Sequence, residues 1–387
     1  MVMLSRRRES GAVSLFLVVF AMLLITVVTL GFLRIMISDQ QQASLNDLSQ
    51  SAYDSSLAGV EDAKRALIYY RTICNQGDQS ACDTQKAIIN STACNQGLRN
   101  VVAVTPNKEV QVQQSQSAND SELNQAYTCV KMKLETIDYL GSVQANTSKL
   151  IPLKTDANFG TVKVEWYTPK DLGTNGTAVN LVSSSAGTPL YLQTNWPSNR
   201  PSLMRAELIQ FSSTFTLDSF NASNSSLTNS NSNTLFLYPI STTETGVITD
   251  TANFTSDVRQ TSRNTPQPVK CASVLNAGGY ACSVTINIPQ AVGQTGSDRT
   301  AYLRLTPLYN GAHFRVTLSD GALFNGVQPS IDSTGRANDQ YRRVESRVDL
   351  IDTNFPFPEA AIDLTGNLCK DFLVTDRASD FRTYCTP

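Results

Sequence analysis

The chain has 387 residues and a formal net charge of −2, with 31 basic and 33 acidic side chains. This near balance, with the arginines scattered along the chain, excludes the basic footprint typical of a nucleic-acid-binding surface. The length is enough for one large domain or two modest ones, each able to bury a core.

The first predicted element is an uncharged apolar run from Ala12 to Leu33 that contains no proline. At about 1.5 Å per residue, a helix of this length matches the roughly 30 Å hydrocarbon core of a bilayer. The run follows the arginines of 6–8, and only Arg34 and then Asp39 come after it. By the positive-inside rule we expect a single-pass membrane protein with a cytoplasmic N-terminus and an extracytoplasmic remainder. The run is longer than the apolar core of a secretory signal, so we expect it to be retained.

Residues 34–71 predict an amphipathic continuation of the same helix. No proline interrupts the stretch from Ile35 to Tyr70, and apolar residues recur there every three to five positions. This spacing keeps one apolar stripe along a helix. An unbroken helix over 12–71 would be about 90 Å long, far longer than a bilayer is thick. Its second half must therefore pack on a globular domain or on neighbouring copies.

The cysteines all follow the apolar run, at Cys74, Cys82, Cys94, Cys129, Cys271, Cys282, Cys369 and Cys385. An even number on the exported side predicts disulfides. The chain has no Cys-x-x-Cys and only one histidine, which argues against a zinc site. The first four cysteines lie in a polar segment, 72–150, and allow three pairings between which the sequence does not choose. In the C-terminal segment, 351–387, the last two cysteines are placed to close a loop, a bridge that contributes about 3 kcal/mol in a chain-entropy model.

The stretch 151–350 predicts a β-rich ectodomain, because apolar and polar residues alternate with period two in several short runs. The predicted strands are Thr161–Tyr167, Arg205–Leu217, Thr234–Tyr238, Ser283–Ile288, Ala301–Tyr309, Ala312–Ser319 and Arg342–Leu350. Between two of them stands Asn310-Gly311, the dipeptide that a two-residue type I′ hairpin turn prefers. Such a hairpin would set Leu303 opposite Leu318 and Leu305 opposite Val316, so that the apolar faces coincide. The expected fold class is α+β: a long N-terminal helix followed by a disulfide-stapled, antiparallel β-rich domain.

The N-terminal seventy residues resemble type IV pilin-like proteins. The features that carry the resemblance are a basic leader, 1–11, which ends at Gly11, the apolar helix and its amphipathic continuation. The segment SAYDSSLAGVEDAKRAL is similar to a pattern of PilX-like minor pilins and large minor pseudopilins. The resemblance implies that a prepilin peptidase cuts after Gly11 and leaves Ala12 as the mature N-terminus. A second likeness, to the last turn and strand of many PilX-like proteins, runs from Ile331 to Arg336 and on from Arg343.

Two departures from the major pilins bear on function. Phe16 stands at the fifth mature position, where major pilins usually carry a glutamate that neutralises the terminal amine of an adjacent subunit. Without that carboxylate an attraction in low dielectric is missing, which suits a minor subunit. The proline that usually kinks the helix is also missing. The resemblance further likens the loop bounded by Cys369 and Cys385 to the C-terminal disulfide loop of many pilins.

No catalytic site is expected, and neither a cofactor nor a metal. His313, on the polar face of the predicted hairpin opposite Leu308, has no nucleophile motif near it and is interpreted as a surface histidine. The pairs Asp250 with Asp257 and Asp332 with Asp339 could offer oxygen ligands to calcium. Without a matching motif we favour solvated turn carboxylates.

Glu61 is the other charged residue singled out within the helix. We expect Glu61 to form an ion pair with Lys64 or Arg65, one helical turn further along. The alternative is that Glu61 contacts a neighbouring subunit.

The leading hypothesis is a minor pilin or pseudopilin of a type IV pilus or related filament, with a structural role in assembly initiation, adhesion or DNA uptake. Its expected partners are other pilin subunits through the N-terminal helix, the prepilin peptidase and membrane lipid, with a surface or DNA ligand left open. The alternative is an uncleaved membrane-anchored ectodomain that binds a cell-wall or host-surface ligand. A tethered hydrolase is disfavoured because no nucleophile and base pair is evident.

Overall fold

The structure is a computed structural model that describes residues 10–112, 124–173, 178–183, 189, 191–211, 234–241, 251–253, 266–275, 279–292 and 300–350. The chain divides into two compact units. The first unit comprises Met1–Met132 and Ile331–Ser346, and the second comprises Lys133–Ser330 and Arg347–Pro387. The predicted α+β layout is confirmed: a long N-terminal helix is followed by β-rich structure with mainly antiparallel sheets.

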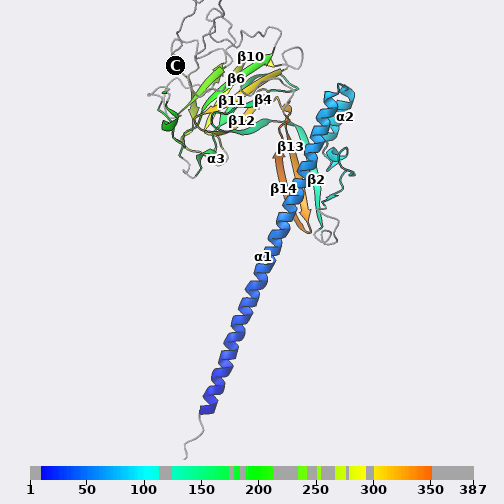
Figure 1. The fold of residues 1–387 in the computed structure, drawn as a ribbon, viewed down its shortest axis with the longest axis vertical. Helices are drawn as coiled ribbons and strands as arrows, with labels where there is room; N and C mark the ends of the chain where they lie inside the picture. The colour runs from blue at the N-terminus through cyan, green and yellow to red at the C-terminus, as the bar shows by residue number, and fades with distance from the viewer. Residues whose placement is uncertain are drawn as a thin grey trace, which may run out of the picture. The chain divides into compact units, whose positions relative to one another are not determined.

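Helix α1 runs unbroken from Ser10 to Asn75, a length of 66 residues (Figure 1). No proline lies within it, so the predicted continuity of apolar run and amphipathic stretch is confirmed. The helix ends just before Gly77, whose φ of 84° is a left-handed conformation that glycine adopts without strain. Helix α2, Gln79–Ile89, begins next, and its N-cap Asp78 accepts a hydrogen bond from the Ala81 amide at 3.1 Å.

The sheet of the first unit has the strand order β1-β2-β13-β14. Its strands are β1 (Val110–Gln111), β2 (Gln125–Thr136), β13 (Phe324–Ala337) and β14 (Gln340–Arg347), and β2 and β13 each continue past the limit of the unit. The short 3₁₀ helix η1, Gln96–Leu98, precedes them in the chain. Figure 1 shows the second half of α1 beside β2, β13 and β14.

The second unit is built on a mixed ten-stranded sheet with the order β3-β12-β5-β10-β9-β7-β6-β11-β4, and β8 pairs with β10. Most neighbours are antiparallel, as expected for this domain, but β7 with β9 and β8 with β10 are parallel. The strands are β3 (Asp138–Val143), β4 (Lys149–Pro152), β5 (Phe159–Trp166), β6 (Leu203–Phe211), β7 (Thr234–Ser241), β8 (Thr251–Asn253), β9 (Gln267–Cys271), β10 (Cys282–Val292), β11 (Thr300–Leu308) and β12 (Ala312–Leu318). The short helices α3 (Pro169–Leu172) and η4 (Gln193–Asn195) lie in its connections.

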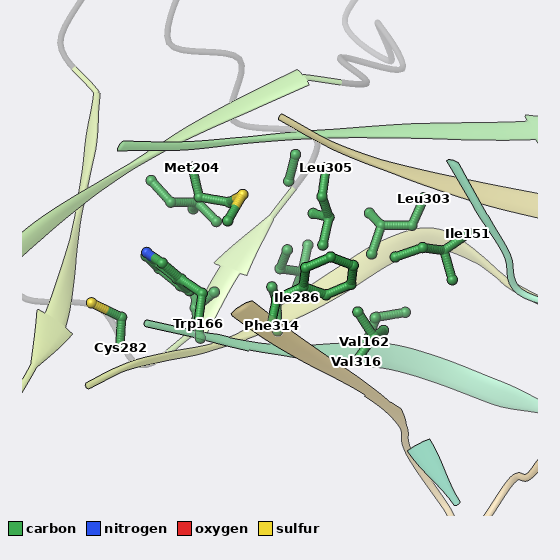
Figure 2. Packing of buried hydrophobic residues seen from close by; sticks show 14 of the residues in the cluster. Ile151, Val162, Trp166, Met204, Cys282, Ile286, Leu303, Leu305, Phe314 and Val316 are labelled. Atoms are coloured by element: carbon green, nitrogen blue, oxygen red, sulfur yellow. The ribbon is translucent and has the colours of Figure 1, made fainter. Parts of the chain in front are cut away.

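The core of the second unit is apolar and centres on β5. Trp166 pairs in register with Cys282 of β10 and with Phe314 of β12, and all three side chains are buried. Figure 2 shows these residues packed with Leu303, Leu305, Met204 and others from neighbouring strands. The indole Nε1 of Trp166 donates a hydrogen bond to the Ser202 carbonyl at 3.1 Å, so its one polar atom is satisfied inside the core.

The predicted hairpin around Asn310-Gly311 is wrong. Strand β11 has its two edges occupied by β6 and β4, and β12 has its edges occupied by β3 and β5, so the two strands are not paired with each other. Leu303 is level with Ile151 and Leu208 rather than with Leu318. The alternation itself was read correctly, because Leu303, Leu305, Phe314 and Val316 are all buried.

The Asn310 side chain explains why the dipeptide does not make a hairpin turn. Its amide donates hydrogen bonds to the carbonyls of Pro197, at 2.8 Å, and Arg200, at 2.9 Å. The asparagine thus ties its loop to another segment of the unit. The non-glycine residue with positive φ at this connection is Tyr309, at 74°.

The sequence also missed strands before the first predicted one, Thr161–Tyr167, because β2, β3 and β4 all precede it. Residues 131–136 of β2 alternate exposed or intermediate with buried side chains, and Met132 and Leu134 lie on the inner side. The stretch Ile331–Arg336, expected as a turn, is part of strand β13, and the short connection to β14 is Asn338 and Asp339. Of the predicted strand Arg205–Leu217, the residues after Phe211 lie outside the described part.

Within the described residues, three disulfides join Cys74 with Cys82, Cys94 with Cys129, and Cys271 with Cys282. The first ties the end of α1 to α2, the second ties the segment before η1 to β2, and the third links neighbouring strands β9 and β10. Disulfide bonding of these six cysteines is confirmed, and the pairing of the first four, left open by the sequence, is settled. Cys369 and Cys385 lie outside the described residues.

Candidate assembly surface of helix α1

The side chains in the first half of α1 are not covered by the rest of the described chain. Its large apolar side chains between Leu15 and Ile37 are each 48% or more exposed, and Phe16 is 75% exposed. This helix is long and apolar enough to cross a membrane, and within the segment that meets this test no residue is buried by the rest of the protein. Isolated exposed apolar residues are normal on proteins, but a continuous apolar surface of this length needs a partner in lipid or protein.

The predicted processing residues belong to this helix. α1 begins at Ser10, so Gly11 and Ala12 lie in its first turn. Phe16 and Glu61 lie on the same helix, 45 positions apart, and the structure does not bring them together. At about 1.5 Å per residue they are separated by about 68 Å along the axis.

The second half of α1 is packed on the sheet of its own unit. The side chains that face the sheet are small or aliphatic, and the buried ones are Ala52, Ser55, Ser56, Val60, Ala63, Ala66 and Leu67. They recur at helical spacing, as the amphipathic pattern predicts, so the apolar stripe expected over 34–71 is confirmed from Ala52 onward. Before Ala52 the helix is mostly exposed.

A pair of glycines lets the helix and the sheet approach closely. A Cβ added to Gly59 would lie 2.5 Å from Ser333 Oγ and 2.8 Å from Val130 Cγ2. A Cβ added to Gly335, on β13, would overlap the backbone of α1 at Ala52 O and Ser56 N. Between the two glycines the Ser333 hydroxyl donates a hydrogen bond to the Ser56 carbonyl at 2.8 Å. The contact is therefore backbone against backbone, and larger residues have no room.

Two polar contacts fasten the same interface. The Tyr127 hydroxyl, on β2, donates a hydrogen bond to Asp62 Oδ2 at 2.9 Å, and Arg65 pairs with Asp62 Oδ1 at 3.2 Å. Burial, and then the hydrogen bond to Asp62, raises the pKa of the Tyr127 phenol above its usual value of 10.0. At the other end of the contact, Arg342 Nε of β14 donates to Ser49 Oγ at 2.7 Å.

We expect Tyr127→Phe to lower the free energy of unfolding of the first unit by about 1 kcal/mol at pH 7, because Asp62 loses a buried hydrogen bond. The raised phenol pKa means that the folded state holds this proton more tightly than the unfolded state does. The Tyr127 contribution is therefore complete below about pH 10 and is lost as the pH rises further. Urea unfolding should show the difference between wild type and variant shrinking above pH 10.

Tyr341→Phe is the matched control for that variant, since Tyr341 is 59% exposed. It should leave the unfolding midpoint unchanged. A difference between wild type and Tyr127→Phe that stays constant from pH 7 to pH 11 would contradict the assignment of the buried phenol.

Glu61 makes the predicted local ion pair. Its carboxylate lies 2.6 Å from Lys64 Nζ, and Arg65 pairs instead with Asp62. Both members of the Glu61–Lys64 pair are more than a third exposed, so the pair contributes only a few tenths of a kcal/mol.

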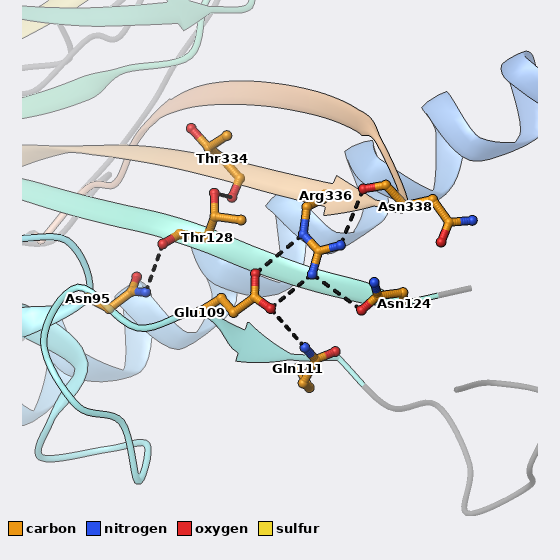
Figure 3. A network of polar contacts seen from close by, with 8 residues as sticks. All are labelled: Asn95, Glu109, Gln111, Asn124, Thr128, Thr334, Arg336 and Asn338. Atoms are coloured by element: carbon orange, nitrogen blue, oxygen red, sulfur yellow. Dashed lines mark hydrogen bonds and ion pairs between the residues drawn. The ribbon is translucent and has the colours of Figure 1, made fainter. Parts of the chain in front are cut away.

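The face of the sheet turned away from the helix carries a polar network (Figure 3). Arg336 of β13 pairs with Glu109 at 2.9 Å and donates to the side chain of Asn124 and the carbonyl of Asn338. Gln111 of β1 donates to the same Glu109 carboxylate at 3.1 Å. The network thus connects β13, near the end of the described chain, with the segment around β1. Asn95 is buried nearby, and its side-chain amide donates hydrogen bonds to the carbonyls of Lys108 and Thr128.

The candidate calcium ligands do not form a common site in the described part of the chain, and Asp339 is an exposed residue in the short connection between β13 and β14. Asp332 makes a two-pronged ion pair with Arg343, with both N–O distances at 2.6 Å. Asp250 and Asp257 lie outside the described residues. Among the residues that the structure describes, no group of three or more His, Cys, Asp or Glu side chains is placed to hold a metal ion.

His313 lies on β12 level with Ser142 of β3, and not with Leu308 as the hairpin would have it. Its ring Nδ1 is 2.7 Å from Asp171 Oδ1, and its side chain is 40% exposed, in keeping with the surface position expected for it. Asp171 also accepts from the backbone amides of His313 and Thr168 and forms the capping box of α3. The pair therefore anchors a short helix to the sheet.

Sequence reasoning missed Tyr127, and it marked Ser333 and Gly335 only as part of the second likeness without placing them against the helix. Gly59 stood within the segment that resembles minor pilins, but its counterpart on β13 lies more than 270 positions away. No pattern within either segment links the two. A comparison of the chain with protein-family models, curated proteins and solved structures found no match.

Proposed function

We propose that this chain is a minor subunit of a type IV pilus or a related pilin-like filament. In this proposal α1 anchors the protein in the membrane through residues 12–33 and, after a prepilin peptidase cuts behind Gly11, enters the interior of the filament. The role is structural. The β-rich second unit, with its disulfide, is the part left to contact a surface or a ligand.

The observation that carries the proposal is the contrast between the two halves of α1. The second half is fixed to its own sheet by buried alanines, glycines and hydrogen bonds. The first half, from Leu15 to Ile37, has exposed apolar side chains throughout. One helix thus has a half that the folded chain covers and a half that only lipid or other protein can cover. The basic leader and the glycine before the apolar run support the filament over a permanent anchor, and Phe16 at the fifth mature position suits a minor rather than a major subunit.

The test is the mature N-terminus. Intact-mass and N-terminal peptide analysis of the protein from cells that contain a prepilin peptidase should show a chain that starts at Ala12, with or without N-methylation. Gly11→Val should leave the full-length chain, because the peptidase requires the small residue at the cut. Gly31→Val is the matched control: nothing lies within 4 Å of a Cβ at that position, and processing should be normal.

A wild-type chain that keeps its first eleven residues in such cells would contradict the proposal. That result would favour the alternative, an uncleaved membrane-anchored ectodomain. Purified surface fibres that never contain the processed chain would contradict the filament role directly.

A further inference from the structure

The loop 191–200 of the second unit carries a run of exposed side chains on an anchored base. Residues 191–195 are all exposed, and they include the short helix η4. Tyr191 is 37% exposed and Leu192 is 73% exposed. Directly after this run, the Trp196 side chain is buried. One side of the loop therefore faces solvent while the other is fixed in the unit.

A column of stacked groups forms the base of the loop. The Trp196 ring stacks on the Tyr309 ring at an interplanar angle of 4°. The Arg200 guanidinium lies 5.1 Å from the centroid of the Trp196 ring and 5.4 Å from that of the Tyr191 ring. Asn180 Oδ1 accepts two hydrogen bonds from this guanidinium, at 2.7 and 3.2 Å. Tyr191 is thus the exposed member of a column whose other members are held in place.

Hydrogen bonds to the connection between β11 and β12 fix the backbone of the loop. The Tyr309 hydroxyl donates to the Tyr191 carbonyl at 2.9 Å, and the side-chain amide of Gln193 donates to the Tyr309 carbonyl at 2.7 Å. Asn310 holds the far end of the loop through two further hydrogen bonds to backbone carbonyls. A loop that is already ordered loses little conformational entropy when a ligand binds to it.

The exposed side of the loop carries no charge. No side chain in 191–199 is ionised, and the cation that follows, Arg200, is only 9% exposed. Nucleic acids and anionic lipid headgroups are bound through exposed cations, so neither fits this surface. The amides of Gln193 and Asn195 and the hydroxyl of Thr194 both donate and accept hydrogen bonds, as the hydroxyl groups of sugars do.

A protein partner fits the loop less well than a sugar. Protein-binding hot spots are enriched in Trp, Tyr and Arg that reach the partner. Here Trp196 and Arg200 are both buried and are used to build the loop itself, so that Tyr191 is left at the surface among short polar side chains.

We propose that the loop 191–200 binds a neutral glycan. The Tyr191 ring packs against the C–H groups on one face of a sugar ring, and Gln193, Thr194 and Asn195 form hydrogen bonds with its hydroxyls. The inference names a ligand class for the second unit and goes beyond the structural role proposed for α1. It holds whether or not the chain is processed after Gly11.

The test measures binding of the full chain in detergent to maltohexaose, cellohexaose and chitohexaose, with heparin as the charged comparison. Titration calorimetry should show binding of at least one of the three neutral sugars and none of heparin. Tyr191→Ala should weaken that binding roughly tenfold, equivalent to about 1.4 kcal/mol. Tyr191→Phe keeps the ring and should retain most of the affinity.

Two further variants separate ligand contact from damage to the loop. Asn195→Ala removes an exposed side chain outside the stacked column and should lower the affinity about threefold, the effect of one neutral hydrogen bond, with an unchanged unfolding midpoint. Tyr341→Ala removes an exposed tyrosine from the first unit and should leave binding unchanged.

The outcomes separate this inference from the proposed function. Absence of binding to all three neutral sugars, binding of heparin alone, or sugar binding that is the same in wild type, Tyr191→Ala and Asn195→Ala overturns the inference. None of these results affects the filament role, which depends on the mature N-terminus. Conversely, an uncut chain that binds a neutral sugar through Tyr191 overturns the filament role and leaves this inference intact.

Discussion

Gly335→Val is expected to detach helix α1 from the sheet of the first unit and to cost about 3 kcal/mol or more, the upper end for overpacking. The reason is geometric. The atoms that an added side chain would meet are the Ala52 carbonyl oxygen and the Ser56 amide nitrogen, which are backbone and cannot rotate away. Opening the contact would also break the Ser333–Ser56 hydrogen bond and expose Ala52, Val60 and Leu67 to water.

Amide hydrogen exchange on the full chain in detergent locates the effect. Protection should fall across the second half of α1 and across β13, while the core strands of the second unit keep theirs. Gly160→Val is the control, since a Cβ there meets nothing within 4 Å, and it should leave exchange in both regions unchanged. Wild-type protection of α1 in the Gly335→Val variant would show that the helix and the sheet are not in direct backbone contact.

Trp166→Ala is expected to lower the free energy of unfolding of the second unit by about 3–5 kcal/mol, the range for removing a large aromatic side chain from a core. The Trp166 side chain is completely buried and lies among β5, β10 and β12 (Figure 2). Its removal leaves a cavity and also leaves the Ser202 carbonyl without its indole donor.

The chain has two tryptophans, so Trp196 remains as the fluorescent reporter of denaturant unfolding in that variant. Trp196 stacks on Tyr309 with ring centroids 4.2 Å apart, in a cluster beside the main core of the same unit. Leu192→Ala is the control, because Leu192 is 73% exposed and should shift stability by less than about 0.5 kcal/mol. An unfolding curve for Trp166→Ala that superimposes on that of Leu192→Ala would contradict the central place of Trp166 in the core.

The elements that follow from local patterns could be predicted, and those that depend on long-range pairing could not. The long helix needed only the absence of proline and a regular apolar spacing, and both are visible in the sequence. The strands Ala301–Tyr309 and Ala312–Ser319 were found from alternation, nearly to the residue. Their partners were not, because β4, β6, β3 and β5 occupy the edges of these strands and contribute paired residues up to 179 positions away in the chain.

The sequence predicted the exposed apolar surface on the first half of α1, but it did not predict how the second half packs on the sheet. The apolar residues of the first half of α1 are read directly from hydropathy, and the local Glu61–Lys64 pair follows from helical spacing. The docking of the second half was missed because it depends on a serine and a glycine in β13, a stretch that resembles a turn in composition. Small residues leave no hydrophobic signal, although they decide how closely two backbones approach.

The close approach at Gly335 also fixes which way the helix faces. Sliding α1 by one residue along its axis would turn every side chain by about 100°, and a side chain other than glycine, alanine or serine would then press on β13. The sheet therefore accepts α1 in only one rotation about the helix axis. In the filament proposed above, this fixed setting means that every copy of the chain presents the same exposed side of α1 to neighbouring subunits.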